Sequence, residues 1–235
     1  IGTPGERMGR IRSTLIAFVA VAGIGARCAE AGEPLGSIIW TGFYAGLQGG
    51  YGWSRSRYSD DTYLSEANPD GLIGGAYIGY NRQLSNRFVL GIEADILAAG
   101  MKGTDGQRYL SDPHTAIPNV GLDLDFKWNG AIRARLGYAT GRYLPYIAGG
   151  VSFGGYQLRM EDYANGTVPF IHNEVRAGWN IGAGIDYVAS DRILLRAEYR
   201  FTDFGTDHFP NSYSGPYSQI ELQTHDVRLG VAMRF

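Results

Sequence analysis

Apolar and polar residues alternate with a period of two along most of the chain, and no long segment after Ala31 has helical spacing. From Phe43 to Trp53 the odd positions are mostly apolar or aromatic, whereas the even positions are mostly glycine or polar. The pattern therefore predicts eight strands, of which the other seven lie near residues 72–82, 88–98, 127–138, 143–153, 176–187, 193–201 and 226–235.

These runs are longer than ordinary strands, and their connections alternate regularly in length. Strands of globular proteins have about five or six residues, whereas runs of roughly ten can cross a bilayer when they are tilted. Short turns are predicted at residues 84–87, 140–142 and 189–192, and long polar loops at residues 55–70, 99–123, 157–173 and 203–223. This arrangement indicates an all-β fold, an eight-stranded antiparallel up-and-down transmembrane β-barrel over residues 40–235.

The apolar face of the strands is predicted to contact lipid. In a soluble lipocalin-type barrel the apolar face would point inward, so alternation alone leaves both arrangements open. Aromatic residues near the strand ends favour the membrane, because interfacial girdles of a membrane barrel have this composition. The predicted girdle is Phe43, Trp53, Trp128, Tyr138, Tyr187, Tyr199 and Phe235.

Charged residues of both signs fall on the glycine-rich face, which is predicted to line the barrel interior. An eight-stranded barrel is just wide enough for its own side chains to fill it, so we expect these charges to form ion pairs. Two interpretations remain open, a packed structural interior, which is favoured, and a gated polar pathway. The predicted interior set is Glu93, Asp95, Lys127, Arg133, Arg135, Arg176, Asp186, Arg196, Glu198, Arg200, Arg228 and Arg234.

A continuous apolar stretch lies near the start of the chain. Residues 8–12 carry two arginines, residues 15–24 are apolar, and Ala29-Glu30-Ala31 fits a small-x-small cleavage site. The apolar run is too short to span a bilayer. We therefore expect residues 1–31 to comprise a few upstream residues and a cleavable secretory signal peptide.

Two alternatives apply to this region. The apolar stretch could instead form an N-terminal anchor helix. Cys28 could mark a lipoprotein site, but Arg27 immediately before it fits such a site poorly. In the favoured interpretation Met8 is the plausible start, Cys28 leaves with the signal, and residues 32–39 form a short periplasmic segment.

Four motifs carry a family resemblance: residues 40–46 (Trp-Thr-Gly-Phe-Tyr-Ala-Gly), 133–138 (Arg-Ala-Arg-Leu-Gly-Tyr), 197–205 (Ala-Glu-Tyr-Arg-Phe-Thr-Asp-Phe-Gly) and 227–235 (Val-Arg-Leu-Gly-Val-Ala-Met-Arg-Phe). They resemble the first, fourth, seventh and last strands of the small outer-membrane β-barrel family. This is the OmpA-like superfamily branch called porin family or outer-membrane immunogenic protein. The terminal Phe235 also resembles the signal that the barrel-assembly machinery recognises.

The resemblance implies a location and a set of partners. It implies export through the secretory pathway to the bacterial outer membrane, with contacts to outer-membrane lipid and lipopolysaccharide. It further implies a structural or surface-interaction role in the envelope, with external ligands bound at the loops. A narrow porin for small polar solutes is an alternative, because fold does not determine function.

Charge and cysteine content exclude other classes of function. The chain has 21 basic and 23 acidic residues and a formal net charge of -2, so electrostatics provide no reason to expect nucleic-acid binding. A single cysteine excludes a disulfide framework and a cysteine-ligated zinc site. Because paired-histidine metal motifs and a nucleophile elbow are also lacking, we predict no metal site and no enzyme activity.

Four histidines leave two minor alternatives open. His114, His172 and His208 fall in predicted loops, and His225 lies near the rim of the last strand. Some relatives of the resembled family bind haemin, and haemin ligands here would be these histidines with Tyr58, Tyr63, Tyr109, Tyr213 and Tyr217. A lipid-modifying enzyme is the other alternative, since Ser218, Glu221 and His225 are close in sequence, although nothing fixes their geometry.

Overall fold

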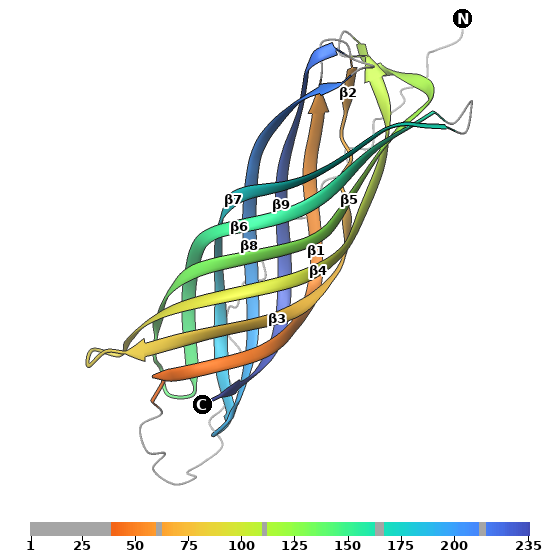
Figure 1. Ribbon diagram of the computed structural model, residues 1–235. Helices are drawn as coiled ribbons and strands as arrows, with labels where there is room; N and C mark the ends of the chain where they lie inside the picture. Colours follow the sequence, from red (N-terminus) through yellow and green to blue (C-terminus); the bar gives the residue numbers. More distant parts are fainter. Residues whose placement is uncertain (1–38, 60–62, 110–111, 163–166, 212–214) are drawn as a thin grey trace, which may run out of the picture. The chain divides into compact units, whose positions relative to one another are not determined.

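The computed structural model describes residues 39–59, 63–109, 112–162, 167–211 and 215–235 (Figure 1). Eight long antiparallel strands pair in chain order, and pairing of the first with the last closes the sheet. The predicted eight-stranded antiparallel barrel is therefore confirmed. Its strands are β1 (Gly42–Ser59), β3 (Asp70–Gln83), β4 (Phe88–Tyr109), β5 (Asp112–Tyr138), β6 (Tyr143–Asp162), β7 (Thr167–Ser190), β8 (Ile193–Asn211) and β9 (Gly215–Arg234), with a short additional strand β2 (Tyr63–Ser65).

Tight turns join the strands at one end of the barrel. The connections after β3, β5 and β7 span only a few residues, as predicted. Gly141 adopts φ 60°, a left-handed conformation that glycine accepts without strain. The C-terminal Phe235 lies at this same end, where its backbone N–H donates to the Phe43 carbonyl at 2.9 Å.

Two belts of aromatic side chains ring the outer face, and an apolar band lies between them. The turn-side belt contains the ring pairs Phe43–Tyr80, Phe88–Tyr138 and Tyr143–Tyr187. The far belt contains Trp53, Trp128, Trp179, Tyr199, Phe201 and His225, with contacts among them such as Trp53–His225 and Trp179–Phe201. The outward residues between the belts are exposed and apolar, including Leu47, Ile92, Ile132, Ile181 and Leu229.

The separation of the belts matches a bilayer. On β1, Trp53 lies ten positions after Phe43, which corresponds to about 33 Å of extended strand. With the usual tilt of a membrane barrel this becomes roughly 25 Å, the height of its apolar band. Among the described residues, no helix is long and apolar enough to cross a membrane.

The prediction of four long loops is largely wrong, because strands continue through most of those segments. Pairing of β4 with β5 extends to Tyr109–Asp112, and pairing of β6 with β7 extends to Asp162–Thr167. Pairing of β8 with β9 likewise extends to Asn211–Gly215. We call the described strand segments beyond the far belt the extension, which comprises residues 54–59, 63–65, 99–109, 112–127, 156–162, 167–178, 202–211 and 215–224.

The extension escaped prediction because its polar and apolar faces are exchanged relative to the membrane band. Its outward residues are mostly polar, for example Arg55, Lys102 and Glu221. Its inward residues form an apolar cluster, the upper core, made of Tyr58, Ala67, Ile73, Met101, Leu124, Phe126, Tyr156, Leu158, Phe204, Ile220 and Leu222. The membrane band thus faces apolar residues outward, whereas the extension packs most of its apolar residues inward, as sheets of soluble proteins do.

A β-bulge on β5 shows how one strand makes this exchange. Phe126 pairs with Tyr156 and Trp128 pairs with Gly155, so Lys127 is an extra residue. An extra residue shifts the following side chains to the opposite face of the strand. On β5, even-numbered apolar residues therefore face inward before the bulge, as Phe126 does. After the bulge they face outward, as Ile132 does.

Candidate functional site

The barrel interior between the belts is filled by charged side chains of both signs. Within the described part of the chain, five guanidinium groups meet five carboxylates there, so their formal charges cancel. Arg200 is 0% exposed and Arg133 is 1% exposed, which leaves no water-sized space against either side chain. The group, called the lumen network below, comprises Arg133, Arg135, Arg196, Arg200, Arg228, Glu93, Asp95, Asp186, Glu198 and Asp226.

Glu93 of β4 is central to the turn-side half of the lumen network. Its Oε2 atom accepts a hydrogen bond from Tyr44 Oη at 2.8 Å and from Arg196 Nη1 at 2.6 Å. Arg135 Nη1 lies 3.4 Å from the same oxygen. Arg135 and Arg196 both also pair with Asp186, at 2.7 Å each. Residues from different strands of the barrel are thereby held together.

Asp95 and Glu198 organise the other half of the network. Arg200 donates to both oxygens of Asp95, at 3.0 and 2.8 Å, and to Glu198 Oε1 at 3.1 Å. Arg133 donates to both Glu198 oxygens, at 2.8 and 3.0 Å, and also to Glu93. Such bidentate bonds use the fixed geometry of guanidinium and carboxylate groups, which favours a single arrangement.

Three buried tyrosines complete the turn-side half. The Arg135 guanidinium lies 3.8 Å from the centre of the Tyr146 ring, and the Arg196 guanidinium lies 4.3 Å from the centre of the Tyr77 ring. Tyr146 Oη donates to Glu198 at 2.7 Å, and Tyr44 donates to Glu93 as described above. The aromatic faces therefore add cation–π contacts to the ion pairs.

Apolar clusters lie on both sides of the lumen network along the barrel axis. The upper core lies beyond it on the far side. The turn-side cluster consists of Trp40, Tyr44, Tyr77, Val89, Ala139, Leu144, Val188, Leu194 and Ala232. The charged layer of the described interior therefore lies between two mostly apolar clusters.

Nine of the twelve predicted interior residues lie in the lumen network, and three lie elsewhere. Lys127 is exposed and pairs with Asp125 at 2.8 Å, because the β5 bulge turns it outward. Arg176 lies on the extension, where it pairs with Asp207. Arg234 lies at the turn end, where it donates to the Ile39 carbonyl.

The prediction missed Asp226, Tyr44, Tyr77 and Tyr146. Asp226 shares the inward face of β9 with Arg228, to which it is hydrogen bonded, so its position in the alternation was an available signal. Tyr44 and Tyr77 fall on the polar face of the alternation, so the same signal was available for them, but the predicted interior set contained charged residues only. Tyr146 lies in the run 143–153, both faces of which are apolar or small, so the alternation did not assign its face.

The seven predicted girdle residues all lie in the two belts or at the turn end, with unequal exposure. Phe43, Trp53, Tyr138, Tyr199 and Phe235 are exposed. Trp128 is half-buried because its indole covers Gly155, where an added Cβ would lie 2.3 Å from Trp128 Nε1. Tyr187 is half-buried against Tyr143.

The described histidines face different sides of the sheet. His208 is exposed on the outer face of β8. His225 belongs to the far belt, where its Nδ1 lies 2.7 Å from Tyr199 Oη. His172 faces inward on β7, with Nε2 at 3.7 Å from Asp207 and 3.8 Å from Glu174. The side chains of His114, Tyr63, Tyr109, Tyr213, Tyr217 and Ser218 lie outside the described residues.

Haemin binding therefore stays an untested alternative to the predicted absence of a cofactor. Within the ranges given above, three or more histidine, cysteine or acidic side chains do not gather in a metal-binding group. Tyr58 lies in the upper core, where it is 0% exposed.

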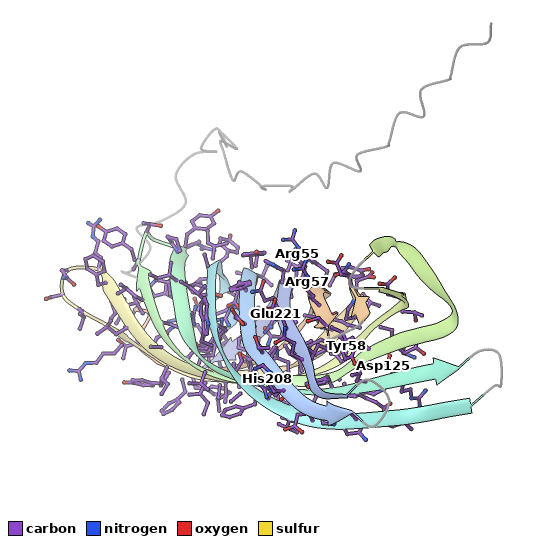
Figure 2. All side chains as sticks on the ribbon, turned by 90° about the horizontal axis from the view of Figure 1, so that it is seen from above. Arg55, Arg57, Tyr58, Asp125, His208 and Glu221 are labelled. Atoms are coloured by element: carbon purple, nitrogen blue, oxygen red, sulfur yellow. The ribbon has the colours of Figure 1, made fainter. Side chains whose placement is uncertain are left out.

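The outer face of the extension carries charges of both signs. Figure 2 shows Arg55, Arg57 and Glu221 close together, where β1 runs beside β9. Arg57 pairs with Glu66 at 3.1 Å. On the inner side, Tyr156 Oη donates a hydrogen bond to Asp207 at 2.7 Å. The pKa of Tyr156 is raised mainly by burial and further by this hydrogen bond. The extension therefore presents charges of both signs on its outer face and a buried tyrosine–carboxylate hydrogen bond on its inner face.

Comparison with known proteins agrees with this geometry. Residues 16–235 match the family model described as outer membrane protein beta-barrel domain. The chain belongs to this family. Its predicted membership of the small outer-membrane barrels and its location in the outer membrane are therefore confirmed.

Relatives of similar length carry names that fit this family. A 31 kDa outer-membrane immunogenic protein of Brucella melitensis is 28% identical over 228 residues, covering 88% of each chain. A 25 kDa outer-membrane immunogenic protein of Brucella canis is 30% identical over 196 residues, covering 83% of this chain and 79% of its own. Neither name describes an enzyme.

A solved structure supports the fold alone. The outer membrane protease OmpT from Escherichia coli is 9% identical, with a TM-score of 0.50, covering 86% of this chain and 99% of its own. At this identity the similarity carries no information on catalysis.

Proposed function

We propose that this protein is a non-enzymatic barrel of the outer membrane with a closed lumen, which stabilises the envelope and displays its extension at the cell surface. The turns would face the periplasm, and the extension would face the medium. Residues 8–31 would direct export, and Phe235 would be read by the barrel-assembly machinery. Lipopolysaccharide and external ligands are the partners we expect at the outer surface.

The layered interior is the observation that carries this proposal. Charges in the lumen are neutralised by direct pairing, and Arg133, Arg200 and Arg228 are each no more than 1% exposed. A porin needs a hydrated path, and the guanidinium groups would have to release their carboxylates to provide one. Removing partners from a buried ion pair is costly, so the network favours a closed, structural interior.

The outer surface of the extension supports the display role. Most of its outward residues are polar and exposed, whereas its inner face holds a packed apolar cluster. A folded, solvated sheet beyond the lipid boundary is suited to contacts with molecules outside the cell. This observation favours surface interaction over solute transport.

Thiol labelling on intact cells tests the display role directly. Cys28 is the sole cysteine, so a Cys28→Ser background isolates an introduced thiol. Thr104→Cys on the extension should react with a membrane-impermeant maleimide in intact cells. Asn86→Cys, in the turn after β3, should react only after the outer membrane is permeabilised. Labelling of Asn86→Cys but not Thr104→Cys in intact cells would contradict the proposed orientation.

A further inference from the structure

The sheet is closed in the membrane band but open between β7 and β8 in the extension. Pairing of β7 with β8 ends at Trp179–Asp203. In contrast, β6 and β7 stay paired to Asp162–Thr167, and β8 and β9 stay paired to Asn211–Gly215. Figure 1 shows β7 and β8 taking different directions beyond this point. The described extension therefore has two strand edges that are not paired with each other.

Local sequence explains where the strands separate. Gly205 adopts φ 69°, and its N–H is bound by Asp203 Oδ1 at 2.7 Å. The register of β8 against β9 shifts at the same place, between Asp203 and Thr206. A left-handed glycine with a register shift is a β-bulge, which bends its strand. The opening is therefore encoded by Asp203-Phe204-Gly205 and is part of the fold.

A side chain bridges the start of the opening in place of backbone pairing. Arg176 Nη2 donates to the Thr206 carbonyl at 2.7 Å, and Arg176 Nη1 donates to Asp207 at 2.5 Å. Farther along β7, the outward side chains Ile171 and Val175 are 51% and 58% exposed. Exposed aliphatic residues on an unpaired edge form a template for another strand, which proteins usually block with charge or proline.

We propose that the β7 edge from Ile171 to Val175, beyond the contacts of Arg176 and Gly178 with β8, binds an extended peptide segment of a partner protein by strand addition. Alternating backbone N–H and carbonyl groups along an edge are matched only by another extended backbone. The bound segment would place apolar residues beside Ile171 and Val175. It would place a basic residue beside Glu174, whose side chain is 41% exposed on the opposite face of β7.

The negative charge of Glu174 favours a different protein, and not a second copy of this chain, as the partner that binds the edge. Symmetric pairing of two β7 edges would bring two Glu174 carboxylates to one face, and like charges across strands are destabilising. A basic residue in the bound segment is instead attracted to Glu174. The site rests on the proposed surface role, because the edge must face the medium to be reached.

A synthetic peptide, fluorescein-labelled Val-Lys-Val-Thr-Val-Lys-Val, tests the site by fluorescence anisotropy with the refolded protein in lipid nanodiscs. We expect saturable binding, which is lost when alternate backbone nitrogens of the peptide are methylated. Val175→Lys should weaken binding at least tenfold. Gln223→Lys is the matched control, because Gln223 faces outward on β9 between two paired strands, and it should bind like the native protein.

Heat-modifiable migration on gels shows that each variant is folded. Equal binding of the methylated peptide, equal binding by Val175→Lys, or no binding at all would overturn the proposal. If the protein self-associates and the peptide disrupts that self-association, the edge binds a second copy of the chain, and the proposal is also overturned. These results would not affect the proposed function as a closed barrel displayed at the cell surface. Failure of Thr104→Cys labelling would overturn the proposed function itself.

Discussion

Arg196 and Glu93 lie 103 residues apart in the chain, yet Arg196 Nη1 donates to Glu93 Oε2 at 2.6 Å across the lumen. The bond links β8 to β4, two strands that are not neighbours in the sheet. Because Glu93 also binds Tyr44 and Arg133, one carboxylate ties together four strands of the barrel.

Replacing this carboxylate tests the energetic role of the lumen network. Glu93→Gln leaves the paired guanidinium groups with surplus buried charge, so we expect a loss of roughly 3–5 kcal/mol in unfolding free energy. Urea unfolding of the protein in lipid vesicles measures this change in unfolding free energy. Asp125→Asn breaks the exposed pair with Lys127 and should cost no more than about 1 kcal/mol. Equal effects of the two variants would contradict a closed, dry network.

The lipid-facing band is tested at Ala134, which is exposed on β5 between two buried arginines. Ala134→Arg puts a charge near the middle of the bilayer and should destabilise the inserted barrel by roughly 2–4 kcal/mol. Ala134→Leu should insert normally in the same vesicle assay. Normal insertion of Ala134→Arg together with failure of Ala134→Leu would mean that the two faces are reversed.

The membrane band could be predicted from sequence, because there one strand face contacts lipid and the period of two is unbroken. The positions of Arg133, Arg200 and Arg228 in this alternation are enough to assign them to the lumen. The partners of each arginine could not be predicted, since they depend on which strands lie opposite across the barrel. The extension was missed because its apolar residues face inward and bulges, such as that at Lys127, interrupt the alternation.

Because apolar residues of the extension face inward and polar residues face outward, alanine substitutions at two adjacent residues should affect stability very differently. Leu222 is 1% exposed in the upper core, and Leu222→Ala should cost roughly 2–5 kcal/mol. Its neighbour Glu221 faces outward, and Glu221→Ala should leave stability nearly unchanged. Limited proteolysis of the reconstituted protein detects loosening of the extension. Greater sensitivity of Glu221→Ala than of Leu222→Ala would contradict the assigned faces.

Haemin capture is tested by optical titration. Because His172 faces inward while His208 and His225 face outward, the described histidines do not converge, and we expect no Soret shift at micromolar haemin. A Soret shift in the native protein that is absent in His208→Ala would instead support capture through the extension.

Conductance of the refolded, heat-modifiable barrel in a planar bilayer tests the closed lumen most directly. The protein should leave the membrane electrically silent, because Arg133 and Arg200 are sealed by their carboxylates between two apolar clusters. Steady, ohmic single-channel steps from the native protein would contradict the closed lumen and would make this barrel a small porin.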